Sequence, residues 1–313
     1  MASDFYYPQG AREATASFGL LYDLTYPGPG LKVGEVLPGG PFGHADSAMR
    51  PGAVITAVNG TPVGSETDPT TLFNAIAGRK TLVAFTLPSG EKAEEVILPV
   101  RSSAVNSLLY DRWVKRNAHL VDSLSNGRLG YVHIKAMNDE SFRTIYSDIL
   151  GKYNECDGIV IDTRFNGGGR LHEDIEVLFS GKKYLTQEIK GEVTGEMPSR
   201  RWNKPSIMLT CEANYSNAHG TPWVYRHMKL GKIVGMPVPG TMSSVNWIDM
   251  QDPSLVFGIP VVGFRTAEGN YLENTQLEPD VRVANDPSRI VLGIDDQLAT
   301  AVRTLLRDLD TAR

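Results

Sequence analysis

The chain has almost no cysteine. Its 313 residues include only Cys156 and Cys211, so it has neither the disulfide framework of a small secreted domain nor the paired cysteines of a zinc site. No stretch approaches the roughly 18 apolar residues that span a bilayer. The first ten residues, MASDFYYPQG, lack the basic and apolar segments of a signal peptide. Since a removed leader would leave the same start, the compartment stays open: periplasm, secretion or, if an upstream region is missing, the cytoplasm.

The chain also lacks an excess of positive charge. The formal net charge is −5, and Lys and Arg are scattered rather than gathered into a stripe, so no nucleic-acid partner is expected. The acidic pairs Glu173–Asp174 and Asp295–Asp296 lie at the starts of predicted helices, where carboxylates interact favourably with the helix dipole. The sequence therefore predicts no metal site and no organic cofactor.

The length of the chain and its pattern of glycine and proline residues divide it into two parts. A chain of 313 residues is long enough for two domains. Residues 16–100 carry short apolar segments separated by glycine and proline, and Asn59-Gly60 is typical of a tight hairpin turn. We predict a β-rich domain over residues 1–103 and a second domain over residues 104–313.

The second part alternates between apolar runs and helical patterns. After a connecting helix over residues 104–126, the alternation predicts a largely parallel sheet covered by helices, and hence an α/β (α+β) fold. The predicted strands are residues 128–134, 158–161, 206–210 and 232–234, and the predicted helices are residues 141–153, 171–179, 222–230 and 295–309.

A glycine cluster follows one of these strands. Residues 162–170 have the sequence DTRFNGGGR, and the backbone N–H groups of such a loop suit an anion or a developing oxyanion. The cluster matches neither the phosphate-loop pattern nor the dinucleotide fingerprint. Taken alone, it is equally well explained as a flexible turn between strand and helix.

Ser216 follows the next predicted strand along the chain. It lies in CEANYSNAHG (211–220), between an apolar run and a helical stretch. Because the carboxyl ends of parallel strands meet at one edge of a sheet, we expect Ser216 and Gly167–Gly169 to converge. A serine that faces a glycine oxyanion donor is the minimum arrangement for acyl transfer.

The β-rich part resembles the circularly permuted PDZ domains of bacterial proteases. The stretch LKVGEVLPGGPFGHADSAMRPGAVITAVNGTPV (31–63) has their order of strand, Gly-Pro turn, small-residue helix and hairpin. The resemblance implies that Phe18, Gly19, Leu20 and Leu21 form a loop that binds a peptide C-terminus. The alternative is that Phe18 and Leu20 are core residues of a strand.

Five segments of the second part resemble tail-specific, or C-terminal-processing, serine peptidases, and within that group most of all the tricorn-like branch. The resemblance implies a crotonase-like peptidase core with an attached PDZ-like domain. The segments, in order, are RLGYVHIKAMNDESF (128–142), DGIVIDTRFNGGG (157–169), CEANYSNAHG (211–220), LGKIVG (230–235) and YLENTQLEPDVRV (271–283).

This resemblance implies a role for each matching residue. Ser216 corresponds to the nucleophile, and Glu273 to the acidic residue that supports the catalytic network. The N–H of Asn217, with that of Gly168 or preferably Gly169, corresponds to the oxyanion hole. Asn217 departs from the family, because the tricorn-like branch has an acidic residue at that position.

The general base is missing from its expected places. Tail-specific peptidases use a lysine where this chain has Thr241, and a neutral hydroxyl cannot replace it unaided. The tricorn-like branch uses a histidine that precedes the PDZ domain, whereas the first histidine here is His44. Either the chain lacks an N-terminal region that carries the base, which we favour, or the base has been lost.

Two other histidines are candidates for a substitute base. His219 lies three residues after Ser216, and His172 begins the helix after the glycine cluster. A single nearby histidine is more often structural than catalytic. His133 lies within an apolar strand, which favours a core position.

We therefore predict a serine endopeptidase or C-terminal-processing peptidase whose partner is a peptide or an unfolded protein, with homo-oligomerisation implied by the resemblance alone. One alternative is a catalytically impaired peptide-binding or scaffold protein that uses the PDZ-like domain and the former cleft. A second alternative, an acyl-CoA enzyme of the crotonase type, leaves the PDZ-like part unexplained.

Overall fold

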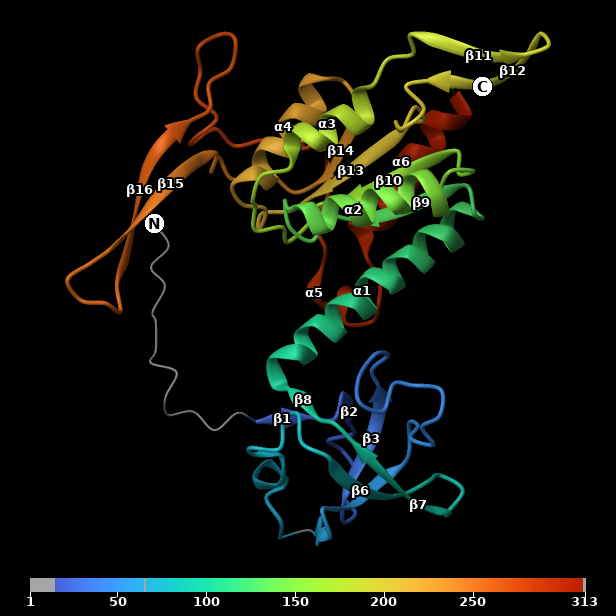
Figure 1. Cartoon of the computed structure of the whole chain (residues 1–313), viewed down its shortest axis with the longest axis vertical. Helices are drawn as coiled ribbons and strands as arrows, with labels where there is room; N and C mark the ends of the chain where they lie inside the picture. The colour runs from blue at the N-terminus through green and yellow to red at the C-terminus, as the bar shows by residue number, and fades with distance from the viewer. Residues whose placement is uncertain (1–14, 65, 312–313) are drawn as a thin grey trace. The chain divides into compact units, whose positions relative to one another are not determined.

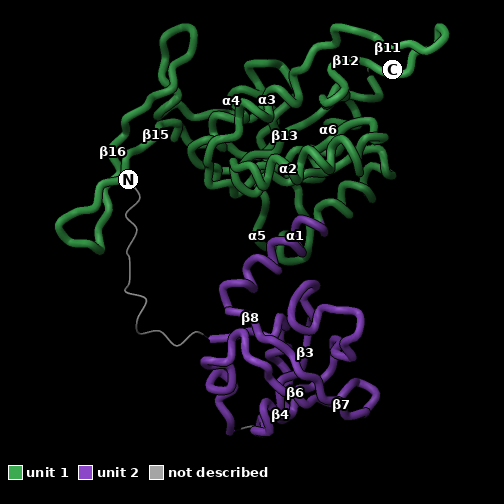
Figure 2. The backbone as a smooth tube through the Cα atoms, in the orientation of Figure 1, with its two compact units in different colours: residues 1–6, 117–313 green, residues 7–116 purple. Residues whose placement is uncertain are grey.

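The computed structural model describes residues 15–64 and 66–311, which form two compact units (Figure 2). The units divide between Arg116 and Asn117. This point lies inside the long helix α1, Ser102–Ser125. The predicted boundary after residue 103 falls at the start of this helix, which the two units share.

The smaller unit is built around an antiparallel sheet with the order β2-β3-β4-β6-β7. Its strands are Leu20–Tyr22, Leu31–Val36, Val54–Val58, Thr81–Thr86 and Lys92–Ile97; β5 (Thr61–Pro62) pairs with β4, and β1 (Ala16–Ser17) pairs with β8 (Val100–Arg101). Asn59 and Gly60 both have positive φ between β4 and β5, which confirms the hairpin turn. Between β5 and β6, Pro69–Phe73 form a 3-10 helix, and Ala75 at φ 57° departs from helical backbone.

The larger unit contains a five-stranded parallel sheet (Figure 1). The strand order is β17-β14-β13-β10-β9, and every neighbouring pair is parallel. The predicted parallel sheet is confirmed, with one further edge strand. The strands are β9 (Leu129–His133), β10 (Gly158–Asp162), β13 (Ser206–Thr210), β14 (Gly231–Gly235) and β17 (Val281–Arg282).

Helices cover both faces of this sheet. Ile159, Ile161 and Met208 belong to one core with α2 (Asp139–Ser147), η3 (Asp148–Lys152), α3 (His172–Ser180) and α4 (Asn217–His227). On the other face, α6 (Asp296–Thr311) contacts β10, β13 and β14. Side chains therefore alternate between the two layers along each strand.

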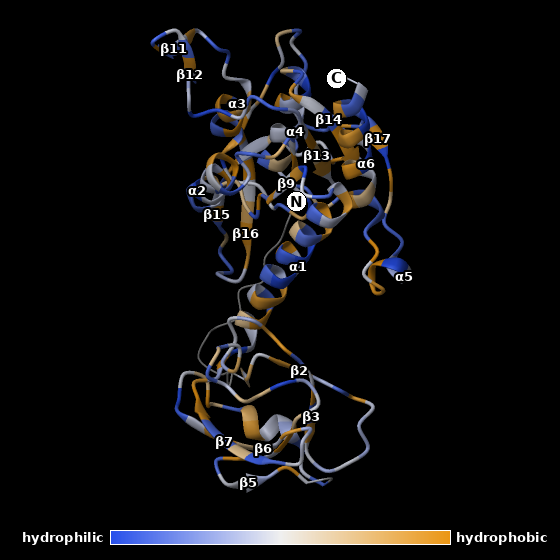
Figure 3. Cartoon of the chain, turned by 90° about the vertical axis from the view of Figure 1, so that its right-hand side faces the viewer, coloured by the Kyte–Doolittle hydropathy of each residue, from blue (hydrophilic) through white to orange (hydrophobic). Residues whose placement is uncertain are grey.

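Two hairpins lie outside the predicted alternation of strands and helices and extend away from the sheet (Figure 1). They are β11–β12 (Leu185–Ile189 and Glu192–Met197) and β15–β16 (Ser243–Asp249 and Val256–Gly263). β16 is mainly hydrophobic, although its apolar side chains are largely exposed (Figure 3). Among the helices that the structure describes, including α5 (Pro287–Ile290), none has the length and apolarity to cross a bilayer.

Candidate active site

The glycine cluster and Ser216 meet at the carboxyl edge of the sheet. β10 and β13 are neighbours, with Asp162 paired to Leu209, so the loops that follow them leave the sheet side by side. A Cβ atom added to Gly168 would lie only 2.7 Å from the Cβ of Ser216. The close approach of these two loops therefore requires glycine at position 168.

Ser216 lies at a sharp strand-to-helix turn in an unusual backbone conformation. Its φ of 54° and ψ of −120° fall in a region that residues other than glycine rarely adopt, and such strain is concentrated at functional sites. The hydroxyl of Thr241 accepts a hydrogen bond from the Ser216 N–H at 2.9 Å. Thr241, at the position where the resemblance implies a lysine, thus helps to hold this turn.

Helix α4 begins directly after Ser216, and the predicted start at residue 222 is wrong. Pro222 lies inside the helix, where its missing N–H leaves the carbonyl of Ala218 without its usual donor. The Asn214 side chain supplies a replacement donor to that carbonyl at 3.3 Å, and it also donates to Thr163 at 2.9 Å. Because α4 starts at Asn217, its first N–H groups lie beside Ser216.

Two backbone N–H groups beside Ser216 are available to an oxyanion. Among the described residues, the N–H groups of Gly169 and Asn217 have no acceptor. The N–H of Gly168 donates to the Asn166 side chain at 2.8 Å. Of the two glycines that the resemblance offered as donors, only Gly169 has a free N–H.

The side chain of Asn217 connects the two helices at the site. Its Oδ1 accepts from the backbone N–H groups of Leu171 at 2.9 Å and His172 at 3.2 Å. Its Nδ2 lies 2.7 Å from His172 Nδ1. Asn217 therefore caps the start of α3 and directly contacts the ring of His172.

His219 does not face solvent. It is 1 % exposed, and neither ring nitrogen has a hydrogen-bond partner among the described residues. Burial lowers the pKa of His219. The backbone of Thr275 and the Glu273 carboxylate raise it, but by less than burial lowers it. Thr275 lies near the ring but outside hydrogen-bond geometry. At neutral pH the imidazole is therefore held uncharged.

Glu273 lies on a segment that contacts the residue before Thr241, the partner of Ser216. Asn274 N–H donates to the carbonyl of Gly240 at 2.8 Å, and Gly240 directly precedes Thr241. Oε2 of Glu273 is buried and has no partner among the residues that the structure describes. An unpaired buried carboxylate oxygen is costly, so this oxygen is suited to accept a hydrogen bond from a further group.

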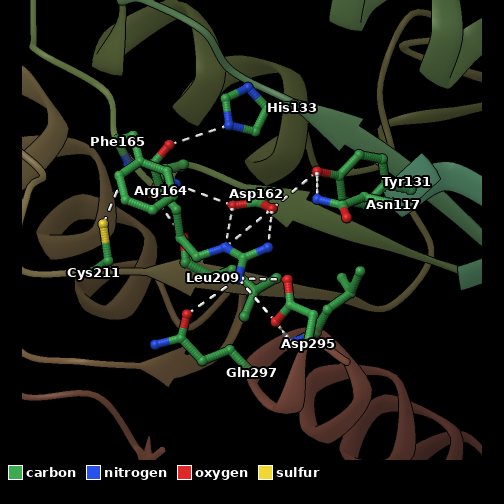
Figure 4. Close-up of polar contacts among 12 residues, drawn as sticks. Asn117, Tyr131, His133, Asp162, Arg164, Phe165, Leu209, Cys211, Asp295 and Gln297 are labelled. Carbon is green, nitrogen blue, oxygen red and sulfur yellow. Dashed lines mark hydrogen bonds and ion pairs between the residues drawn. The ribbon is translucent and has the colours of Figure 1, made fainter. Parts of the chain in front are cut away.

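Arg164, which we did not predict as a site residue, anchors the start of the glycine loop (Figure 4). It is 1 % exposed, and its guanidinium donates to Asp162 at 2.7 Å and to Asp295 at 2.9 Å. Burial alone would raise the pKa of Asp162, but Arg164 reverses this effect and leaves the pKa lowered. Since Asp295 directly precedes α6, the cluster ties the loop to that helix. Asp295, which we predicted only to favour the helix dipole, contacts this buried cation.

One cavity is lined in part by Ser216, and a second cavity neighbours the first. The first, about 400 Å³ in volume, is lined by Ser216, Gly169 and Asn217 together with the base of the β15–β16 hairpin. The second, about 160 Å³, is lined by Trp223, Leu272 and Arg265. His172, Met242 and Phe264 line both cavities, which are therefore contiguous.

The predicted peptide-binding loop lies in the smaller unit, and its side chains differ in burial. Phe18 and Leu20 are buried in that unit's core, whereas Leu21 is partly exposed. Gly19 has φ 69°, and its N–H donates to Ser17 Oγ at 3.1 Å. The core positions fit the strand interpretation of Phe18 and Leu20, and the peptide-binding role of the loop stays a prediction.

Replacing Gly169 with alanine is expected to disturb the oxyanion site. Its φ is +132°, and an added Cβ would lie 2.2 Å from the carbonyl oxygen of Met137, so the loop must move. Loss of one oxyanion donor typically costs about 10²–10³ in rate. We expect a decrease of this size in the rate at which a fluorophosphonate modifies Ser216.

Gly167→Ala is the matched control, because a Cβ at Gly167 meets nothing within 4 Å. Equal labelling rates for the two variants would exclude Gly169 from the oxyanion site.

His219 is expected to make the protein less stable in acid. Its folded-state pKa lies below the ordinary value of 6.5, so the unfolded chain binds a proton more readily. The free energy of unfolding should therefore fall as the pH drops below 6.5. His219→Leu should reduce this fall, measured by urea denaturation at about pH 7.5 and pH 5.5. The same fall in both proteins would show that His219 does not contribute.

Comparison with known proteins agrees with this geometry. Residues 128–283 match the model of peptidase family S41. Separately, the described residues contain no group of three or more His, Cys, Asp or Glu side chains that could hold a metal ion. The chain is 26 % identical over 276 residues to the tricorn protease of Thermoplasma volcanium, covering 83 % of this chain and 25 % of that protein. It is 25 % identical over 315 residues to tricorn protease homolog 1 of Streptomyces coelicolor, covering 97 % and 29 %.

Among solved structures, the crystal structure of the tricorn protease matches with a TM-score of 0.83 at 20 % identity. The match covers 95 % of this chain and 29 % of that one, and it shows that the fold is shared. The chain spans about a quarter of the length of the curated relatives that it matches.

Proposed function

Because the chain belongs to peptidase family S41 and resembles its tricorn-like members, we propose that it is a serine peptidase core that hydrolyses peptide bonds through Ser216. The observation that carries the proposal is the pair of free N–H groups, on Gly169 and Asn217, beside a strained serine. This combination supplies both a nucleophile and a stabiliser for the charge that develops on the carbonyl oxygen.

In the proposed reaction, Ser216 Oγ forms a bond to the scissile carbonyl carbon and loses its proton to a base. The carbonyl oxygen becomes an oxyanion and accepts hydrogen bonds from Gly169 and Asn217. The C–N bond then breaks, and the amine leaves with the proton that the base returns. Water attacks the acyl-enzyme in the same way and regenerates the serine.

The identity of the base is the open part of this proposal. His172 Nδ1 is occupied by Asn217, and His219 is buried without a partner, so neither is arranged as a base for Ser216. By resemblance, the base is a histidine supplied from outside the described residues and supported by Glu273, whose unpaired Oε2 is available. Substantial turnover by the chain alone would instead assign the role to His172 or His219, and a leucine at each position would identify which.

The β-rich unit and the oligomeric state complete the proposal. We propose that the PDZ-like unit captures a peptide C-terminus with the backbone around Phe18–Leu21, and that the protein is a homo-oligomer. Titration with C-terminal peptides, with amidated peptides as the control, tests the first. Light scattering at several concentrations tests the second.

A second candidate is a peptide-binding protein without turnover, which is favoured because neither His172 nor His219 is arranged as a base among the described residues. A fluorophosphonate separates the two candidates when the protein tested includes the region that carries the base, because only an activated serine reacts. Modification at Ser216, located by mass spectrometry, supports the peptidase. An unmodified Ser216 in a folded chain that still binds peptides supports the second candidate.

A further inference from the structure

The contact between Asn217 and His172 determines which nitrogen of the imidazole carries the proton. Two backbone N–H groups, those of Leu171 and His172, donate to Asn217 Oδ1, so this end of the amide must be the oxygen. The other end is then the NH₂ group, which has only donors. It lies 2.7 Å from His172 Nδ1, and this nitrogen must therefore accept.

A neutral imidazole whose Nδ1 accepts carries its proton on Nε2. Nε2 of His172 has no partner among the residues that the structure describes. His172 is a lining residue of both cavities, and its ring lies edge-to-face against Phe264, which also lines both, with centroids 6.4 Å apart. We infer that His172 offers these cavities a donor, not a base.

The smaller cavity is suited to a side chain that is apolar along its stem and anionic at its end. Trp223, Val224, Met242 and Leu272 form apolar walls, and Arg265, an exposed residue, is the only cationic side chain among the described residues that line it. Among the described residues that line it, none is a carboxylate. A lysine or arginine side chain would bring its charge to Arg265 without a counter-ion, whereas a carboxylate finds both a cation and the His172 donor.

We propose that His172, held as a donor by Asn217, and Arg265 select substrates with a glutamate side chain in the 160 Å³ cavity beside Ser216. This inference rests on the proposed function of Ser216 and adds its substrate class. Glutamate suits the cavity better than aspartate, because its extra methylene group contacts the apolar walls.

The experiment uses peptidyl phosphonates that react covalently with an activated serine and differ only in the side chain next to phosphorus: glutamate, glutamine, norleucine or lysine. We expect the glutamate compound to modify Ser216 about tenfold faster than the norleucine compound, and faster still than the lysine compound. Equal rates, or a preference for lysine, would overturn the inference. If no compound modifies Ser216 in a protein that includes the region carrying the base, the proposed function itself fails.

His172→Phe keeps the ring against Phe264 and removes the donor, so it should reduce the glutamate preference about tenfold. His119→Phe, on the exposed surface of α1, is the control and should retain the preference. An unchanged preference in His172→Phe would exclude His172 as a specificity residue.

A measurement on the wild-type chain tests the same inference, so its result does not depend on the folding of a variant. The ¹⁵N shifts of the His172 ring distinguish the two tautomers, and we expect Nε2 to carry the proton at pH values where the ring is neutral. A proton on Nδ1 would contradict the assignment. Asn217→Asp replaces the donor with an acceptor and should move the proton to Nδ1, which would confirm that Asn217 sets the tautomer.

Discussion

Ser216→Ala should lower the rate of peptide hydrolysis by about 10⁴-fold or more, and it should remove fluorophosphonate labelling altogether. Without Oγ, the free N–H groups of Gly169 and Asn217 could still polarise a carbonyl, but no covalent bond to the enzyme can form. Residual hydrolysis would then come from bound water alone. The rates are measured with a quenched fluorescent peptide, and the labelling by intact-protein mass spectrometry.

The loss should not arise from unfolding. Ser216 is partly exposed, and serine and alanine are similarly strained at φ 54°. We expect the free energy of unfolding to change by less than about 1 kcal/mol. Ser288→Ala, at an exposed position in α5, serves as the control and should keep both activities. Undiminished turnover by Ser216→Ala would remove Ser216 from the role of nucleophile.

Arg164→Met should be the most destabilising substitution in the larger unit. The long apolar side chain fills most of the space of arginine but leaves Asp162 and Asp295 buried without their cation. Removing one partner of a buried ion pair typically costs about 3–5 kcal/mol. We expect a loss of this size in the free energy of unfolding, measured by urea denaturation at pH 7.

Arg143→Met removes the same charge from an exposed pair with Asp139 on α2 and should cost about 0.5 kcal/mol or less. Equal losses for the two arginines would mean that the buried cluster does not anchor the fold. The wild-type protein should also lose stability in acid below pH 3.8, because the lowered pKa of Asp162 means that the unfolded chain protonates first. The Arg164→Met variant should lose less of its free energy of unfolding over the same fall in pH.

The sequence was sufficient to predict the parallel sheet and the meeting of its two loops. Apolar runs and helical patterns alternate from residue 128 onward, and loops after neighbouring parallel strands must share an edge. Ser216 and Gly168 are therefore brought together by topology alone.

The remainder of the site depends on packing that local patterns do not specify. Arg164 and Asp295 are in contact although 131 positions separate them in the sequence. The local sequence around either residue gives no sign of this contact. Pro222 suggested a helix start, whereas the Asn214 side chain compensates for proline inside the helix. The contact of Asn217 with His172 appears only once α3 and α4 are packed together, and it shows why the neighbouring histidine is not an obvious base.

The backbone at Ser216 has a consequence for how this chain can evolve. Glycine tolerates φ 54° more readily than serine, so drift toward glycine at this position would gain stability while removing the nucleophile. A serine here is not favoured by folding, and its presence is most simply explained by selection for chemistry at Oγ. On the proposed function, glycine at this position in related chains should therefore mark lineages that have lost the nucleophile and retained the fold.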